Sequence, residues 1–244
     1  MILIFIMKKF VDGLKELNIV LSDNQLKQFK DYYDLLIEWN SFMNLTAITE
    51  WEEVVIKHFL DSLSLIKVVP DMTHVSYSLL DVGTGAGFPG IPLKIAFPNL
   101  NVTLLDSLNK RVKFLNEVID QLGLTDIEAL HGRAEDFAQD MTYREQYDIV
   151  VSRAVANMTV LSEFCLPFVK IGGVFVSYKS EKISEEFEDA KKAISILGGE
   201  YLKEVDFNLP FSSIYRNLFV ISKKDSTSKK FPRKAGIPSK EPLC

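Results

Sequence analysis

The segment LLDVGTGAGFPGIPL, residues 79–93, constrains the fold of this chain more than any other. Gly83, Gly85 and Gly87 stand directly behind an apolar run that ends in Asp81, and a fourth glycine follows at position 90. Glycine permits positive φ and lets another group approach the backbone closely. In open α/β sheets, ligands bind beyond the carboxyl ends of the strands. We therefore interpret this segment as a strand followed by a ligand-binding loop.

The rest of the chain after residue 76 alternates apolar, strand-like runs with amphipathic helices. This rhythm is typical of a mostly parallel sheet that is covered by helices on both faces. The last two strands have no helix between them, so we expect an antiparallel pair at one edge. Strands are predicted at 77–83, 101–107, 127–132, 147–154, 172–180, 200–207 and 216–222, and helices at 91–97, 109–123, 159–170 and 181–197.

The chain is predicted to divide into three parts. Residues 1–75 read as a helical region that packs on the core, with capping-box patterns at Ser22 and Thr49. Residues 76–223 form the α/β domain. Residues 224–244 form a basic tail, although the whole chain carries a net charge of −5. The apolar start MILIFI is far shorter than the ~20 residues of a membrane span, so we expect no membrane association, and Met7 is an alternative start.

Two nucleotide-binding patterns fit the glycines. Gly85 and Gly87, with the glycine at 90, match a dinucleotide fingerprint, and Asp106 lies 21 residues beyond Gly85. The frame that begins at Asp81 and takes in Gly83, Gly85 and Gly87 resembles the first motif of S-adenosylmethionine-dependent methyltransferases. A pyrophosphate needs free N–H groups at a helix start, whereas Phe88 and two nearby prolines crowd this turn. The sulfonium of S-adenosylmethionine is cationic, so an acid such as Asp81 favours the methyltransferase interpretation.

Residues at the ends of the next strands then take roles in the same site. We expect Asp106 to accept hydrogen bonds from ribose hydroxyls, with capping of the following helix as the alternative. Ala134 and Glu135 stand where the adenine would lie, or they cap a short helix. Arg153 follows the fourth strand and would hold the carboxylate of the cofactor or orient the acceptor base, unless it forms a surface ion pair.

The acceptor is constrained by what the fourth-strand loop lacks. It has no Asn/Asp-Pro-Pro-aromatic run of the kind that amino-methylating enzymes use. Cys165 lies in an apolar helical stretch and Cys244 is the last residue, so neither is placed as a nucleophile, and two such cysteines suggest a reducing cytoplasm. The loop SRAVA offers no general base. An acceptor with a free lone pair, such as N7 of guanine, could be methylated by positioning alone.

Several motifs together resemble one family, ribosomal RNA small subunit methyltransferase G, also called glucose-inhibited division protein B. The resemblance runs from about residue 10 to 240 and is carried by LLDVGTGAGFPGIPL, LLDS..KR..FL, GRAED, D.VVSRAVA, WN...NLT, HFLDSL and FPRKAGIPSKEPL. It implies a Rossmann-like class I methyltransferase that transfers a methyl group from S-adenosylmethionine to guanine N7 in 16S rRNA. It also implies cofactor contacts at Gly83, Phe88, Ala134, Glu135 and Arg153. The start MILIFI is not a feature of the family.

An RNA substrate gives the basic tail a role. We expect an extended arm that contacts rRNA phosphates through Lys229, Lys230, Arg233, Lys234 and Lys240. The partner would be 16S rRNA in the small ribosomal subunit or its precursor, and the enzyme a cytoplasmic monomer. His58 and Asp61, one helical turn apart, would face the RNA or the cofactor cleft, or be structural.

Other functions stay open on the sequence alone. A Rossmann-fold methyltransferase could act on a small molecule or a protein, with the N-terminal helices as a lid. The glycine pattern also admits an NAD-binding oxidoreductase or a nucleotide-binding module without catalysis.

Overall fold

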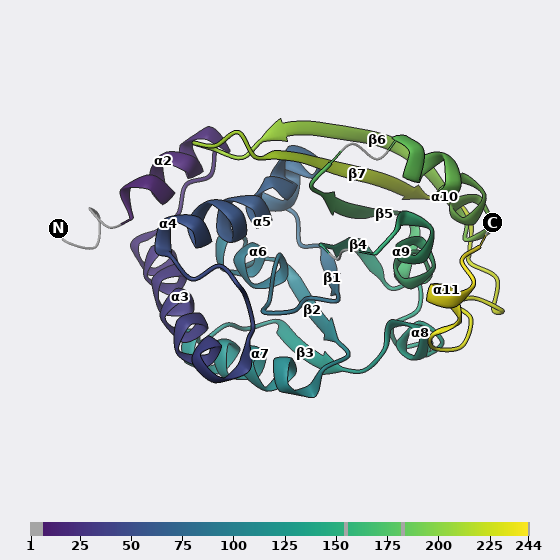
Figure 1. The fold of residues 1–244 in the computed structure, drawn as a ribbon, viewed down its shortest axis with the longest axis horizontal. Helices are drawn as coiled ribbons and strands as arrows, with labels where there is room; N and C mark the ends of the chain where they lie inside the picture. Colours follow the sequence, from purple (N-terminus) through teal and green to yellow (C-terminus); the bar gives the residue numbers. More distant parts are fainter. Residues whose placement is uncertain (1–6, 154–155, 182–183, 244) are drawn as a thin grey trace.

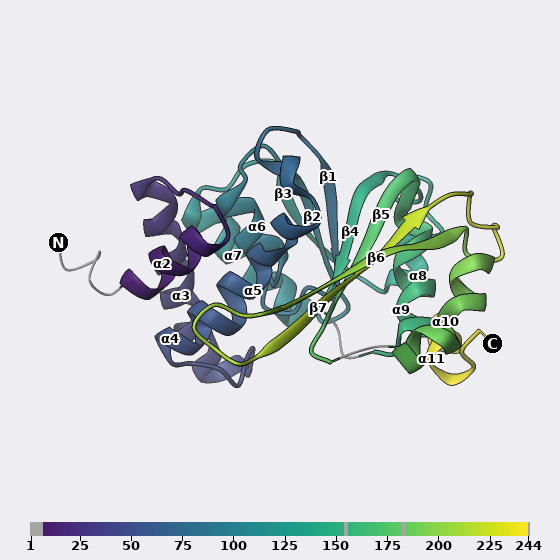
Figure 2. The ribbon, with the colours of Figure 1, turned by 90° about the horizontal axis from the view of Figure 1, so that it is seen from above.

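The structure is a computed structural model that describes residues 7–153, 156–181 and 184–243. The segment MILIFI, residues 154–155 of the SRAVA loop, and Cys244 therefore lie outside the described residues. One seven-stranded sheet forms the centre of the molecule, with helices on both sides (Figures 1 and 2).

The sheet has the strand order β3-β2-β1-β4-β5-β7-β6. Strands β1 to β5 run parallel, and β7 is antiparallel to both β5 and β6. The mostly parallel sheet with its antiparallel pair at one edge is thus confirmed. The strands are β1 Ser78–Val82, β2 Asn101–Asp106, β3 Ile127–His131, β4 Tyr147–Ser152, β5 Val169–Lys179, β6 Gly199–Asn208 and β7 Tyr215–Lys223.

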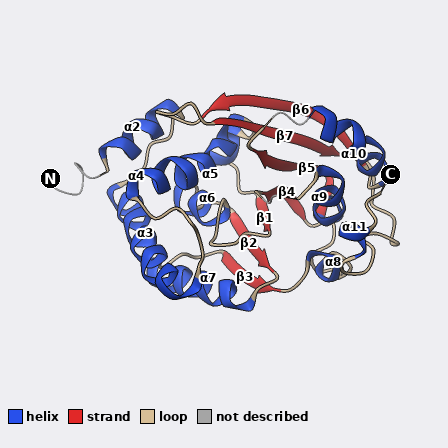
Figure 3. Ribbon diagram, in the orientation of Figure 1, coloured by secondary structure: helices blue, strands red, loops and turns tan. Residues whose placement is uncertain are grey.

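Helices cover each face of the sheet because the central strands are apolar on both sides. Figure 3 shows the helices, in blue, on both sides of the red sheet. One face carries α6 (Gly90–Ala96) and α7 (Asn109–Leu122) together with the N-terminal helices. The other carries α8 (Ala134–Phe137), α9 (Met158–Cys165), α10 (Ser184–Ile196) and α11 (Ile237–Lys240). The helix predicted at 159–170 ends early, at Cys165, because Pro167 follows in a 3₁₀ turn at Leu166–Phe168.

The described part of the N-terminal region consists of helices joined by loops. Ser22 starts the long helix α3 (Asp23–Met43) with the predicted capping box, in which Gln25 bonds back to the Ser22 N–H. The predicted capping box at Thr49 is wrong: Glu50 stands at the N-cap of α4 without a side-chain cap, and the Thr49 carbonyl accepts the Tyr33 hydroxyl. The elements are α2 Lys8–Glu16, α3, α4 Trp51–Val54, a π-helical turn η1 Val55–Leu60, α5 Asp61–Leu63, and 3₁₀ turns at Ser64–Lys67 and Pro70–Thr73.

An aromatic cluster joins these helices to the sheet. The rings of Phe10, Phe29 and Phe59 are fully buried and lie within 6 Å of one another. Tyr32 stacks on Phe59 and donates its hydroxyl to the carbonyl of Ala86 in the glycine loop. The N-terminal helices thus share one apolar core with β1 and β2. The division at residues 75 and 223 stays a prediction.

Candidate active site

The glycine loop lies between β1 and α6, at the carboxyl ends of the parallel strands. Gly83, Gly85 and Gly87 have φ of +74°, +64° and +97°, a region that side chains disfavour. A Cβ atom at Gly83 or Gly85 would meet open space, whereas one at Gly87 would lie 2.8 Å from the Tyr32 hydroxyl. Gly83 and Gly85 therefore leave bare backbone for a ligand, and Gly87 makes room for α3.

Asp106 holds the glycine loop from the end of β2. Its carboxylate accepts the Gly85 N–H at 2.9 Å and the Leu108 N–H at 2.9 Å, and Arg111 lies at 3.3 Å. Leu108, not Asp106, is the N-cap residue of α7. A carboxylate has about four lone-pair positions, so these bonds do not preclude a ribose contact, which stays a prediction.

Asp81 lies fully buried beneath the loop. One carboxylate oxygen accepts the Thr84 hydroxyl at 2.6 Å and the Gly90 N–H at 2.9 Å, which fixes both ends of the turn. The other oxygen has no hydrogen-bond partner among the described residues. Burial raises the pKa of Asp81 to about 6, against the opposing effect of these bonds. An unpaired buried oxygen of this kind is accounted for when a ligand or an ordered water binds beside it.

A cavity of about 360 Å³ opens beside the loop. Its size is within the ~300–1,000 Å³ of ligand pockets. Gly83 and Ser107 line it from the strand ends, and Ala134 and Glu135 from the start of α8. The structure therefore brings the predicted adenine-binding residues to the same cavity as the first glycine, although the contact with adenine itself is not tested.

A second, polar cavity of about 470 Å³ adjoins the first, because Ala156 lines both. Its walls come from the π-helical turn, α5, the end of β5 and the start of β7. The charged residues that line it are Lys57, Asp61, Arg153, Lys179, Glu181, Glu186 and Arg216.

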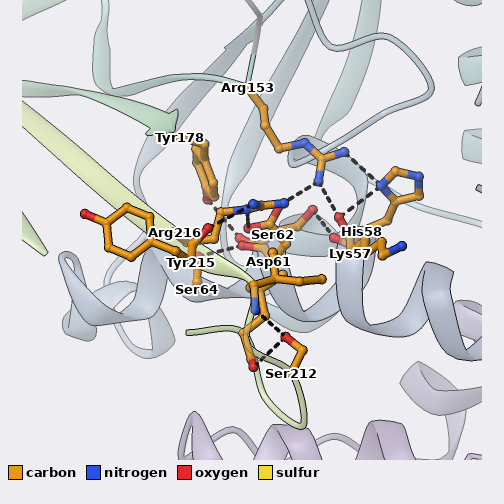
Figure 4. Close-up of polar contacts among 12 residues, drawn as sticks. Lys57, His58, Asp61, Ser62, Ser64, Arg153, Tyr178, Ser212, Tyr215 and Arg216 are labelled. Atoms are coloured by element: carbon orange, nitrogen blue, oxygen red, sulfur yellow. Dashed lines mark hydrogen bonds and ion pairs between the residues drawn. The ribbon is translucent and has the colours of Figure 1, made fainter. Parts of the chain in front are cut away.

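Asp61 is the centre of the polar contacts in the wall of this second cavity (Figure 4). Its side chain is 1% exposed. One oxygen accepts Arg153 at 3.1 Å and the other accepts Arg216 Nε at 3.0 Å. Arg153 also donates to the carbonyl of Lys57. Asp61 is therefore a clamp for two guanidinium groups and also lines the cavity, so whether it faces RNA or the cofactor stays a prediction. The surface ion pair considered for Arg153 is instead a partly buried one.

His58 supports the same arginine. Its ring stacks on Phe88, with centroids 4.4 Å apart, and Arg153 lies over Phe88 as well. Burial, then the nearby Arg153 charge, lowers the pKa of His58 to about 3. The ring is therefore neutral. A guanidinium only donates, so we assign Nδ1 as the acceptor of Arg153 at 3.2 Å; the Lys57 carbonyl lies 3.1 Å from the same Nδ1, and the Thr46 hydroxyl lies 3.0 Å from Nε2. Both ring nitrogens of His58 are therefore in contact with neighbouring polar groups.

Among the residues that the structure describes, no other catalytic group stands out. Within the described ranges, no group of three or more His, Cys, Asp or Glu side chains is placed to hold a metal ion. Cys165 is buried in α9, and burial raises the pKa of its thiol well above the usual value. Cys165 is thus a core residue, as expected.

The basic tail differs from the prediction. The prediction of an extended arm is wrong, because residues 224–240 fold back against α8 and α9 (Figure 1) and Phe231 is buried. Arg233 binds Glu163 through Nε and a terminal nitrogen at 2.9 and 2.7 Å, because that carboxylate is buried and needs a partner. Lys229, Lys230, Lys234 and Lys240 are exposed, and their contact with RNA stays a prediction.

Sequence reasoning missed several residues of the site. Arg216 stands at the start of a strand-like run, where nothing marks it, and Tyr178 lies inside another. Glu163 carried a signal, since it is the only acidic residue in the apolar helical stretch 158–170.

Comparison with known proteins gives a consistent result. The profile of the family described as "rRNA small subunit methyltransferase G" matches residues 25–212. Two relatives carry the name ribosomal RNA small subunit methyltransferase G. That of Lachnoclostridium phytofermentans is 58% identical over 96% of both chains, and that of Lactococcus lactis subsp. lactis is 51% identical over 96% of this chain and 98% of its own.

Solved structures agree on the fold. A putative O-methyltransferase from Klebsiella pneumoniae has a TM-score of 0.55 at 11% identity and covers 80% of this chain and 90% of its own. TrmN from Thermus thermophilus has a TM-score of 0.51 at 16% identity over 67% of this chain and 48% of its own. These likenesses support the Rossmann-like fold.

Proposed function

The chain belongs to the rRNA small subunit methyltransferase G family, and on this premise we propose that it transfers the methyl group of S-adenosylmethionine to N7 of a guanine in 16S rRNA. The observation that carries the proposal is the loop at Gly83 and Gly85. Its bare backbone is fixed by Asp106, and Gly83 lines the cavity that holds the adenine-binding candidates. The cavity with the paired arginines adjoins that one at Ala156.

The residues present fit S-adenosylmethionine. Gly83 and Gly85 would lie against the nucleoside, Asp106 would hold the ribose, and Ala134 and Glu135 would flank the adenine. Bound there, the cofactor supplies a methyl group on a cationic sulfur. Asp81 carries the unpaired oxygen beneath the loop, a feature that suits a cation better than a pyrophosphate.

Arg153 is the candidate for the carboxylate of the cofactor. Its contacts with Lys57, His58 and Asp61 use three of the five N–H groups of a guanidinium. Asp61 and His58 hold the group in one orientation, which lowers the entropy lost when a ligand binds.

The groups that bind Arg153 in the polar cavity support an acceptor that has no proton to lose. Nδ1 of His58 is occupied by Arg153, and both oxygens of Asp61 accept arginines. Neither is available as a general base. N7 of guanine has a lone pair and no hydrogen, so holding it in line with the methyl group is sufficient, and positioning can supply much of the rate.

We further propose that the substrate is 16S rRNA within the small ribosomal subunit or its precursor, and therefore that the enzyme works in the cytoplasm. We also propose that it works as a monomer. The polar lining of the second cavity, with Lys57, Lys179 and Arg216, favours RNA over an apolar small molecule. No helix in the described part of the chain is long and apolar enough to span a bilayer.

Deletion of the gene tests this proposal. Mass spectrometry of nucleosides from 16S rRNA should show one 7-methylguanosine missing, restored by the wild-type gene and not by Asp106→Ala. An unchanged content of 7-methylguanosine in the deletion strain would contradict it.

A further inference from the structure

The C-terminal segment has a place in the structure that its composition does not suggest. Residues 224–240 cross the outer side of α8 and α9 and end in α11 (Figures 1 and 2). Gly236 and Ser239 there line the cavity beside the glycine loop. Phe231 and Pro238 are buried along this path. The segment is therefore anchored on the α/β domain at intervals along its length.

Arg144 is the first anchor of this segment. Its side chain is 5% exposed, and its two terminal nitrogens donate only to backbone carbonyls. They reach Ala138 at 2.8 Å, Phe231 at 2.9 Å, Thr227 at 2.6 Å and Ser228 at 3.2 Å. Three of these carbonyls belong to the C-terminal segment, so one buried guanidinium fixes its course.

Glu163 is the second anchor. This α9 carboxylate is 1% exposed and binds Arg233 three ways, through the backbone N–H at 2.8 Å and the side-chain pair described above. A two-pronged arginine–carboxylate pair fixes direction as well as distance. Removal of either partner would leave a buried charge, which is costly.

The segment then reaches the cavity itself. The Gly236 N–H donates to Glu135 Oε1 at 2.9 Å, and both Gly236 and Ser239 line the same cavity as Gly83. Glu135 is the residue expected beside the adenine. The orientation of its carboxylate is therefore set by the C-terminal segment.

We infer that residues 231–239 form a wall of the adenosine side of the cofactor site, and that the Arg233–Glu163 pair is the device that positions this wall. The inference rests on the proposed use of S-adenosylmethionine. Arg233 then serves cofactor binding and not RNA binding, in contrast to the exposed lysines beside it.

Titration calorimetry with S-adenosylmethionine tests the inference through Glu163→Gln, Arg233→Gln and their double variant. Each single variant should weaken binding by about tenfold or more, a change of one decade in Kd, and the double variant should lose no more than either single one because the two side chains act as a pair. Lys234→Gln is the matched control. It removes a charge from the same segment but not an anchor, and should bind as the wild type.

A second variant covers the case in which the loss of the ion pair unfolds the chain. Ser239 is exposed and lines the cavity, so Ser239→Trp should fold normally, block the adenosine side and weaken binding of S-adenosylmethionine and of adenosine alike. Circular dichroism reports folding for each variant.

The outcomes separate this inference from the proposed function. A wild-type protein that fails to bind S-adenosylmethionine refutes the proposed function. A wild type that binds, together with folded Glu163→Gln or Ser239→Trp that binds equally well, overturns the inference alone. Loss of RNA affinity in Arg233→Gln with unchanged cofactor affinity would overturn it as well, in favour of an RNA contact.

Discussion

Replacement of Asp61 tests the clamp in the polar cavity. Asp61→Ala leaves Arg153 and Arg216 without the carboxylate that both of them bind. Truncation of one partner of a buried ion pair costs ~3–5 kcal/mol. The two arginine side chains are 19% and 18% exposed, so water reaches them in part. We therefore expect the free energy of unfolding to fall by about 3 kcal/mol, the lower end of that range.

Asp61→Asn should be nearly as destabilising as Asp61→Ala. The amide keeps one acceptor oxygen for one arginine, and that charge-assisted bond becomes an ordinary one, a loss of about 1 kcal/mol. Its NH2 group is a donor that faces the other guanidinium, so the second bond is lost, which costs a further ~1.5 kcal/mol or more. Asp31→Asn is the control. Its pair with Lys27 is exposed on α3, and exposed pairs of this kind contribute less than ~0.5 kcal/mol.

Urea denaturation followed by circular dichroism measures the stability, and transfer of labelled methyl to 16S rRNA measures activity. Displacement of Arg153 by about 1 Å should slow transfer by about 10²-fold in Asp61→Ala. A loss of less than about 1 kcal/mol, together with methyl transfer at the wild-type rate, would refute the account of Asp61 as a clamp.

Three further predictions concern the loop, His58 and the tail. Gly85→Ala and Gly123→Ala place a Cβ in open space at nearly the same positive φ, +64° and +61°. Each should lose about 1–2 kcal/mol of stability, but calorimetry should show weaker cofactor binding only for Gly85→Ala; equal binding by both would contradict the role of the loop. Because the folded pKa of His58 is about 3 and the unfolded one is 6.5, the unfolded state binds the extra proton between these values, and stability falls as pH falls. Between pH 7 and 5, the free energy of unfolding measured in urea should drop by about 2 kcal/mol more for the wild type than for His58→Asn. If the two free energies changed with pH in the same way, His58 would not be buried in its neutral form. Reversal of the exposed charges at Lys229, Lys230 and Lys234 should weaken rRNA binding and reduce its salt dependence, while cofactor affinity measured in the same samples stays constant. If rRNA methylation were unchanged at all salt concentrations, the tail would not contact RNA.

The strands and helices of the α/β domain could be predicted from sequence because each is a local pattern. The runs before Asp81 and Asp106 are buried on both faces and read as strands without ambiguity. Gly123 ends α7 in a left-handed conformation, as its position after the last apolar residue indicated.

The polar cavity could not be predicted in the same way. Asp61 binds Arg153 and Arg216, which lie 92 and 155 residues away in the sequence. Charged residues show no sequence periodicity from which such pairs could be predicted. A π-helical turn also precedes Asp61, and turns of this type often occur at functional sites. The pair His58 and Asp61 was visible in sequence, but its partners were not.

For the C-terminal tail, composition alone led to a wrong prediction. Glycine, prolines and lysines predicted an extended arm, yet Phe231 is buried and Arg233 is paired. The acid at position 163, inside an apolar helix, required a cationic partner from elsewhere. That requirement, together with Arg144, brings the segment back onto the domain.

Binding of two cofactors to the purified protein tests the central claim most directly, namely that the loop at Gly83 and Gly85 holds S-adenosylmethionine. Titration calorimetry should show saturable binding of S-adenosylmethionine and no heat from NAD. If the well-folded protein bound NAD saturably and did not bind S-adenosylmethionine, the account would be contradicted.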